Sequence, residues 1–427
     1  MPRPLIVYVT PRPPYPPTSG AVIRQFQLLR AYNRVGRVHL VTLGSDDDRS
    51  AARPLEGHCE GIHIISTQTA AAEAIRHAHR VRRIAGWVRG YRPGAVKWSY
   101  SAELERVLED LAGDADVVHV ARLAMTCHTE RLVRRRRKPR MVLDLDDVES
   151  SAKFRELRYG PREQLAHRLF GYYDLARLWA YEATMVRRFD RVFVCSERDR
   201  RRFGLSNVVV VPNGAHVPPV PPERRTDGLT LLFCGQLSYG PNADAVRFLV
   251  TSVFPEIRQA LPDTRLLIVG RGPAPDIMAL HDGKSIVVAN DVPSVTDYYA
   301  AATIAVVPLR FGGGTRLKIL EAWAHGVPIV STTVGCEGLD GLDGQHLMVA
   351  DRSRDFASRC VALLRSPELR DRIAREGRRL VAERYRWEDI GTRAVAEVAL
   401  SLPGYADADQ VDHVQSTAAG SNDGERH

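Results

Sequence analysis

Short runs of apolar and β-branched residues alternate with longer amphipathic stretches along most of this chain, and this alternation limits its fold more than any other feature. Such runs, bounded by turn residues, are typical of strands buried on both faces. Strands that alternate with helices build parallel sheets covered by helices. The expected strands are 5–9, 38–43, 62–65, 117–120, 141–145, 192–195, 208–211, 230–234, 265–269, 285–288, 304–307 and 328–331.

A proline-rich segment divides this pattern into two halves. Residues 217–228 carry four prolines and little periodicity, as a linker does. A chain of 427 residues has room for two domains. We expect one doubly wound domain over 1–216 and a second over 229–386, with the binding site in a cleft between them. A last helix is expected over 387–402, followed by a polar, disordered tail over 403–427.

The composition is that of an ordinary globular protein, with 44% hydrophobic and 26% charged residues. The six cysteines form no C-x-x-C pair, so neither a zinc site nor a disulfide framework is expected. The first apolar run is too short for a signal peptide, and no run reaches the length of a membrane span. We therefore expect a cytoplasmic protein.

The net charge of +9 indicates an affinity for anions, although it identifies none. Arginine supplies most of the basic residues, and clusters occur at 76–83 and 134–140. These clusters are either solvated surface or, with Trp87 and Val88 near the first, a patch for peripheral contact with an anionic membrane at the inner face of the cell membrane. Nucleic-acid binding rests on the charge alone and is not expected.

Residues 306–323 combine a strand, a glycine loop and a helix. Gly312, Gly313 and Gly314 let the backbone approach a ligand closely, and Thr315 is an expected N-cap. The cations that follow, at 316 and 318, fall where the helix dipole disfavours positive charge by about 0.3–1 kcal/mol each.

Arg316, Lys318 and the free N–H groups of this helix together make a site for an anion, most naturally a diphosphate. Glu321 lies one turn beyond Lys318, where its carboxylate can accept two hydrogen bonds from a ribose diol. The alternative is a surface helix with Lys318 and Glu321 as an ion pair. That alternative explains neither the glycines nor the unfavourably placed cations.

These residues resemble the donor-site motif of retaining GT-B glycosyltransferases of family GT4. Glu321-Ala322 and Gly326-Val327-Pro328 match the second half of the motif, whereas Gly313 stands at its first acidic position. The chain is similar instead to a subgroup with a glycine-rich Gly-Thr-Arg-Leu-Lys form, here 314–318, which is associated with exopolysaccharide and other surface-glycan pathways.

The resemblance implies a GT-B fold, in which two Rossmann-like α/β domains face a cleft and the last helix crosses back onto the N-terminal domain. It implies a nucleoside-diphosphate sugar as co-substrate, a UDP-sugar by default, with no cofactor or metal required. Gly20 and Gly235 match glycines close to the donor phosphates. Members of the family usually place cations after the first strand of the second domain, but residues 235–242 hold none. Arg316 and Lys318 would then supply that charge.

Two further features of the N-terminal half remain open. His119 matches the first histidine of a His-x-His motif at the edge of the cleft, while the second position is Ala121. His119 is therefore either a catalytic residue or a core residue, with Arg122 as a rival. Asp144 and Asp146 form a D-x-D pair, which would bind a metal, begin a helix or meet the acceptor.

We predict a hexosyltransferase that moves a sugar, with retention, to a glycan, lipid-linked or small-molecule acceptor. One alternative is a nucleotide-sugar epimerase or hydrolase that uses carboxylates of 144–149. Another is a non-catalytic partner protein with the same fold. A dinucleotide-dependent oxidoreductase is rejected, because Pro273 follows Gly270-Arg271-Gly272 in its best fingerprint.

Overall fold

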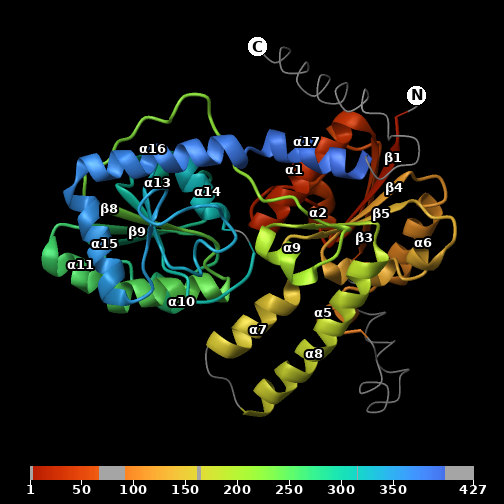
Figure 1. The fold of residues 1–427 in the computed structure, drawn as a ribbon, viewed down its shortest axis with the longest axis horizontal. Coiled ribbons are helices and arrows are strands. Elements are labelled where there is room, and N and C mark those ends of the chain that lie inside the picture. Colours follow the sequence, from red (N-terminus) through yellow and green to blue (C-terminus); the bar gives the residue numbers. More distant parts are fainter. Residues whose placement is uncertain (1–2, 67–91, 161–164, 315, 400–427) are drawn as a thin grey trace. The chain divides into compact units, whose positions relative to one another are not determined.

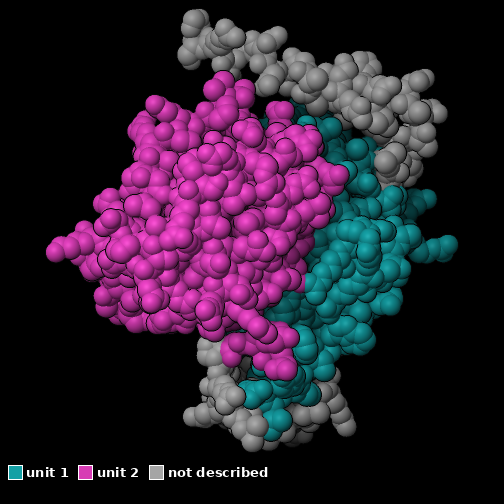
Figure 2. All heavy atoms as spheres, turned by 60° about the vertical axis from the view of Figure 1, so that its left-hand side comes forward, with its two compact units in different colours: residues 1–157, 162–212, 388–427 teal, residues 158–161, 213–387 magenta. Residues whose placement is uncertain are grey.

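Every strand expected from the apolar runs is present, and all pairs of neighbouring strands are parallel. The computed structural model describes residues 3–66, 92–160, 165–314 and 316–399. The chain divides into two compact units (Figure 2). The first comprises Met1–Leu157, Arg162–Pro212 and Glu388–His427, and the second comprises Arg158–Pro161 and Asn213–Trp387.

The first unit is built on a seven-stranded parallel sheet with the order β3-β2-β1-β4-β5-β6-β7 (Figure 1). All six residues of the central strand β1 are buried, which explains its unbroken apolar sequence. The strands are β1 Leu5–Thr10, β2 Arg37–Gly44, β3 Gly61–Ser66, β4 Val117–Ala121, β5 Arg140–Leu145, β6 Arg191–Val194 and β7 Val208–Val210.

The described helices of the first unit, except the last one, connect successive strands, as the alternation predicts. They are α1 Gly20–Val35, α2 Asp46–Ala51, α5 Gly94–Trp98, α6 Ala102–Leu111, α7 Glu149–Tyr159, α8 Leu165–Arg188, α9 Glu197–Phe203 and α17 Trp387–Ala399, with 3-10 turns at Arg53–Gly57, Leu123–His128 and Leu132–Arg134. The last helix, α17, packs on α1: a Cβ on Gly391 would lie 2.9 Å from Cβ of Ala31. The expected tail over 403–427 lies outside the described residues.

The second unit repeats this plan with a six-stranded parallel sheet in the order β10-β9-β8-β11-β12-β13. Its strands are β8 Thr230–Cys234, β9 Arg265–Gly270, β10 Ile286–Asn290, β11 Ile304–Val307, β12 Ile329–Ser331 and β13 Met348–Val349. Its helices are α10 Gly240–Phe248, α11 Phe254–Ala260, α12 Pro275–Met278, α13 Thr296–Ala301, α14 Leu317–Ala324, α15 Ser353–Arg365 and α16 Pro367–Arg384.

A π-helical turn interrupts the α-helical hydrogen bonding of one long helical stretch in the second unit. Residues 240–260 run without a gap through α10, the π-helical turn over Leu249–Val253, and α11. Pro255 lies in the first turn of α11, where its missing N–H group costs nothing, but it cannot continue the hydrogen-bond ladder of a helix that precedes it.

Both strand orders place a reversal point beside the first strand of the sheet. In the first unit it lies between β1 and β4, and in the second between β8 and β11. In open parallel sheets, ligands bind beyond the carboxyl ends of the strands at such a point. The glycine loop follows β11 directly, so the topology puts residues 308–314 at the expected ligand edge of the second sheet.

Candidate active site

Loop residues that follow β8 and β11 gather around the N-terminus of α14 in the second unit. A Cβ added to Gly235 would lie 2.8 Å from Nζ of Lys318, so the glycine gives the ammonium group its space. A Cβ on Gly270 would lie 1.8 Å from the carbonyl oxygen of Gly235. The loop after β8 and the end of β9 therefore meet backbone to backbone, which only glycine permits at 270.

The glycine loop has the backbone conformation that its sequence predicts. Gly312 has a φ of 117° and Gly314 a φ of 72°, both in the region that favours glycine. The carbonyl oxygen of Gly313 accepts a hydrogen bond from the guanidinium of Arg316, whose side chain is buried. Three of the predicted donor-site residues, Gly313, Gly314 and Arg316, thus lie together in one turn of chain.

The start of α14 differs from the expectation. The helix begins at Leu317, with Arg316 in the N-cap position and no side-chain cap. Arg316 therefore precedes the first turn instead of lying in it, while Lys318 does lie in it. Thr315, the expected N-cap and donor-site residue, lies outside the described residues.

Lys318 is held by a neutral partner rather than by a carboxylate. Its ammonium donates to Oδ1 of Asn242 at 2.7 Å and lies 4.5 Å from the ring centroid of Phe233. The amide of Asn242 in turn donates to the carbonyl oxygen of Gln236 at 2.8 Å. Burial, together with the nearby positive charge of Arg316, lowers the pKa of Lys318 to about 7. This cation is poorly solvated and poorly compensated, so a bound anion would stabilise its charged form.

Glu321 is held from the opposite side by Tyr299 of α13. The hydroxyl of Tyr299 lies 3.3 Å from Oε2 of Glu321 and 3.4 Å from the carbonyl oxygen of Lys318. The ring of His325 stacks on Tyr299 at 4.7 Å, and its Nδ1 lies 2.8 Å from the carbonyl oxygen of Glu321. Burial raises the pKa of the Glu321 carboxyl. Lys318 and Glu321 thus each have a partner of their own, in place of the ion pair that the alternative interpretation requires.

Sequence reasoning missed Asn242 and Tyr299 as parts of this site. Asn242 ends the cation-free segment 235–242 that follows β8. No local spacing marks either one, because each reaches the site only through the tertiary fold. Asn242 sits on α10, and Tyr299 on α13.

Arg310, the other cation of the glycine loop, is committed elsewhere. Its guanidinium pairs with both carboxylate oxygens of Asp244, at 2.5 and 2.9 Å, and lies over the ring of Phe248. Arg310 therefore supports the loop from α10, and the positive charge at the ligand edge comes from Arg316 and Lys318.

In the first unit, His119 occupies the middle of the core. It is completely buried, its Nδ1 lies 2.8 Å from the hydroxyl of Tyr32, and the rings of Tyr8 and Phe193 contact it. Burial, with a contribution from Arg24, lowers its pKa to about 3, so the imidazole is neutral at ordinary pH. This surrounding agrees with the core interpretation that the sequence left open, and a catalytic role for His119 stays a prediction.

The D-x-D carboxylates of the first unit are both bound by arginines. Asp144 makes a two-pronged ion pair with the completely buried Arg24, at 2.7 and 2.8 Å. Asp146 accepts from Arg122 at 3.2 Å. Among the described residues, no group of three or more His, Cys, Asp or Glu side chains is placed to hold a metal ion. Gly20 begins α1 at the ligand edge of this sheet, and its contact with a donor stays a prediction.

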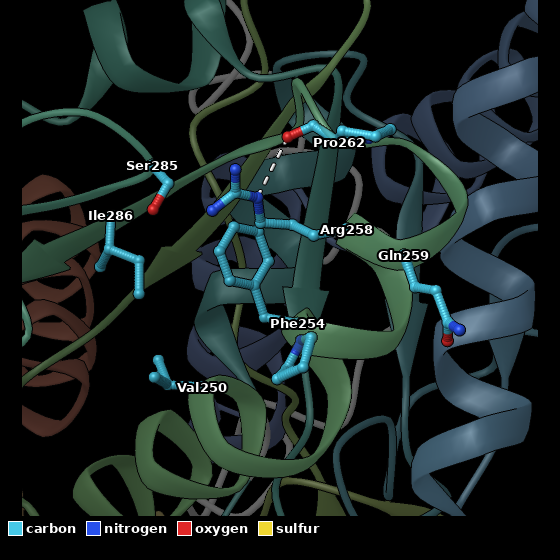
Figure 3. A pocket seen from close by; sticks show the side chains of 8 residues that line it. Val250, Phe254, Arg258, Gln259, Pro262, Ser285 and Ile286 are labelled. Atoms are coloured by element: carbon cyan, nitrogen blue, oxygen red, sulfur yellow. Dashed lines mark hydrogen bonds between the residues drawn. The ribbon is translucent and has the colours of Figure 1, made fainter.

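A pocket lies at the opposite end of the second sheet from the glycine loop (Figure 3). Arg258 donates to the carbonyl oxygen of Pro262 at 3.1 Å across its wall. Because Pro262 precedes β9 and Ser285 precedes β10, this pocket lies at the amino ends of the strands, away from the glycine loop. Its lining is Val250, Phe254, Pro255, Arg258, Gln259, Pro262, Ser285 and Ile286.

The basic clusters are only partly described. The first, 76–83 with Trp87 and Val88, lies outside the described residues. In the second, Arg135 lies 3.7 Å from Glu109, and Arg140 lies 3.7 Å from Asp190. In the described part of the chain, no helix has both the length and the apolar character needed to cross a membrane.

Residues 228–366 match the model of the family described as glycosyl transferases group 1. A phosphatidyl-myo-inositol mannosyltransferase of Mycobacterium leprae is 28% identical over 231 residues, which are 52% of this chain and 55% of that protein. The chain therefore spans about half the length of the curated relatives it matches.

Solved structures match over nearly the whole chain. The structure of Alr3699/HepE from Anabaena, in complex with UDP and glucose, has a TM-score of 0.63 and 13% identity, covering 93% of this chain and 99% of that one. Sucrose-phosphate synthase from Thermosynechococcus elongatus has a TM-score of 0.65 and 18% identity, covering 92% and 98%. Two parallel-sheet α/β domains were predicted and are confirmed: the chain has the fold of GT-B glycosyltransferases, and its second unit matches glycosyl transferases group 1.

Proposed function

We propose that this chain is a retaining glycosyltransferase, which moves a hexose from a nucleoside-diphosphate sugar to an acceptor hydroxyl. The observation that carries the proposal is the setting of Lys318. A poorly solvated ammonium on a neutral amide, at a helix N-terminus and at the reversal point of a parallel sheet, is suited to a diphosphate.

Different residues of the second unit would bind different parts of the donor. In the reaction, the bond between the anomeric carbon and the diphosphate breaks, a bond from that carbon to the acceptor oxygen forms, and the acceptor hydroxyl gives up its proton as the nucleoside diphosphate leaves. Arg316, Lys318 and the N–H groups of α14 would stabilise the negative charge that develops on the diphosphate. Glu321 would bind the ribose and so fix the position of the sugar. Residues 229–386 are then the donor domain and residues 1–216 the acceptor domain.

UDP is the nucleotide that we propose, since Alr3699/HepE has the same fold and was solved with UDP and glucose. The acceptor is a glycan, a lipid-linked sugar or a small molecule of a surface-glycan pathway. The relative from Mycobacterium leprae, named as acting on a phosphatidyl-inositol, favours a lipid-linked acceptor. For the epimerase or hydrolase alternative, Asp144 and Asp146 are both committed to arginines. That alternative would then depend on Glu149, because burial raises the pKa of its carboxyl to about 7.

The proposal is tested by release of nucleoside diphosphate from UDP-glucose, UDP-galactose, UDP-N-acetylglucosamine and GDP-mannose, with and without an extract of bacterial lipids. We expect release from one donor, stimulated by the extract, with label transferred to a lipid or glycan. Glu321→Ala should abolish most of it, whereas Glu223→Ala, on the exposed surface, should not.

Two other outcomes would replace the proposal. Conversion of a nucleotide sugar into its epimer, or into free sugar, regardless of acceptor would favour the alternative enzyme. Binding of nucleotide without turnover of any donor would favour the non-catalytic partner protein.

A further inference from the structure

Helix α8 has two apolar faces, of which only one is covered. Towards the first unit, Leu178, Tyr181 and Met185 are buried in the core. The opposite face carries large side chains that are exposed, among them Leu169 at 63% and Trp179 at 60%. A helix that is apolar all round is normally buried all round, so the second face calls for an explanation.

The exposed side chains form one continuous face. Leu169, Tyr172, Tyr173, Ala176 and Trp179 follow each other at intervals of three or four residues or as direct neighbours. At 3.6 residues per turn, this spacing keeps them on one side of the helix. Figure 1 shows α7 and α8 extending away from the sheet of the first unit. Leu157 of α7 packs against Gly171, on the other side of α8.

The charges around this face are mainly positive. Of the acidic side chains on the described part of α8, Asp174 accepts from the N–H of Gly94 at 3.1 Å, and Glu182 is buried. The basic side chains of α8 that are at least partly exposed are Arg168, Arg177, Arg187 and Arg188.

We propose that the face formed by Leu169, Tyr172, Tyr173, Ala176 and Trp179, called here the α8 face, docks on the surface of a membrane that contains anionic phospholipid. Tyrosine and tryptophan favour the headgroup region, where the ring is sheltered and the polar end stays hydrated. The surrounding arginines would contact lipid phosphates. A second copy of this chain fits less well, since two such positive surfaces would repel each other.

This inference goes beyond the transfer reaction and needs no nucleotide, so it stands or falls separately from the proposed function. The test is sedimentation of the full chain with vesicles of phosphatidylcholine alone or mixed with phosphatidylglycerol. We expect binding to the mixed vesicles only, weakened by salt. Replacing two large apolar contacts by Leu169→Ser and Trp179→Ser should weaken binding by roughly tenfold or more.

The matched control is Leu342→Ser, which removes an equally exposed leucine from the second unit and should leave vesicle binding unchanged. Circular dichroism and thermal melting check that the variants fold as the parent does. Failure of the parent to bind mixed vesicles, or equal binding by the double variant, overturns the proposal. Light scattering that finds a dimer, reduced to a monomer by the double variant, assigns the face to a second copy and also overturns it.

Discussion

The two sheets share a strand order, yet their carboxyl edges hold cations in opposite ways. In the first unit, Arg24 is matched by Asp144 at 2.7 Å, and Arg122 by Asp146 at 3.2 Å. In the second unit, Lys318 donates to the amide of Asn242, and no carboxylate of a described residue lies within ion-pair distance of it.

The difference separates a structural charge from one suited to a ligand. A buried ion pair is complete in itself, and removing one partner leaves a charge that the interior cannot solvate. A cation on a neutral amide has already lost much of its hydration without gaining an opposite charge. The first arrangement stabilises a core, whereas the second gains most when an anion binds.

Removing Asp144 should have the largest effect, and it should fall on stability. Asp144→Ala leaves the guanidinium of Arg24 buried without its carboxylate, which costs roughly 3–5 kcal/mol in the free energy of unfolding. Urea unfolding measures this loss. Glu60→Ala is the control, since Glu60 pairs with Arg37 on the surface at 3.3 Å and should cost roughly 0–1 kcal/mol. Equal losses of unfolding free energy in the two variants would mean that the buried pair contributes no more to stability than the surface pair.

Removing Lys318 should act on binding and leave stability intact. Lys318→Met should weaken binding of a nucleoside diphosphate by roughly ten- to hundredfold, the value of one or two charge-assisted hydrogen bonds. The free energy of unfolding should stay the same or rise, because a poorly solvated charge is gone. Calorimetry and urea unfolding measure both, with the exposed Lys284→Met as control. A large loss of stability with unchanged binding would mean that Lys318 has a structural role and does not bind the anion.

The pH dependence of binding should sharpen the same point. Lys318 has a pKa of about 7 in the free protein, and a bound diphosphate would raise it. Below pH 7 the ammonium of Lys318 is already charged, so its titration does not make the affinity for diphosphate change with pH. As pH rises above 7, binding must take up a proton, and affinity should fall by up to about tenfold per pH unit.

Lys318→Arg, whose charge does not titrate in this range, should remove the pH dependence above 7. Calorimetry in buffers with different ionisation enthalpies should detect the same proton uptake in the wild type. A flat profile in the wild type would mean that Lys318 is charged before the anion arrives.

The support from Tyr299 should have the smallest effect. Tyr299→Phe removes the hydroxyl that holds Glu321, which is worth about 0.5–1.5 kcal/mol, or a few-fold in nucleotide affinity. Since the proposed partner of Glu321 is ribose, binding of inorganic diphosphate should not change. The neighbouring Tyr298→Phe is the control. Equal weakening of nucleotide and inorganic diphosphate would mean that Tyr299 supports the whole helix rather than Glu321.

The sequence predicted the fold better than the site, for a physical reason. Buried parallel strands need apolar side chains on both faces, so a short run of local sequence is enough to predict each strand, as in residues 230–234 and 304–307. Among the strands in the described part of the chain, only the two-residue β13 is too short to leave such a signal. The glycine loop and its cations were also local features.

Residues that come into contact only in the folded chain leave no comparable pattern in the sequence. Asn242 is distant in sequence from Lys318, and only the folding of the chain brings the two into contact. The same holds for Tyr299 and Glu321. The D-x-D pair raised a metal site among its alternatives, but Arg24, from α1, binds its first carboxylate. The apolar residues of α8 do not indicate that one face of the helix is exposed, since residue type alone does not say which side of a helix the core covers.

Binding of UDP, GDP, ADP and dTDP, measured by calorimetry on the wild type, Arg316→Ala and Glu321→Ala, tests most directly whether the N-terminus of α14 is a donor site. We predict that one nucleotide binds at micromolar strength, that Arg316→Ala weakens nucleotide and inorganic diphosphate alike, and that Glu321→Ala weakens only the nucleotide. Absence of binding by all four nucleotides, or binding that neither substitution changes, would contradict the account.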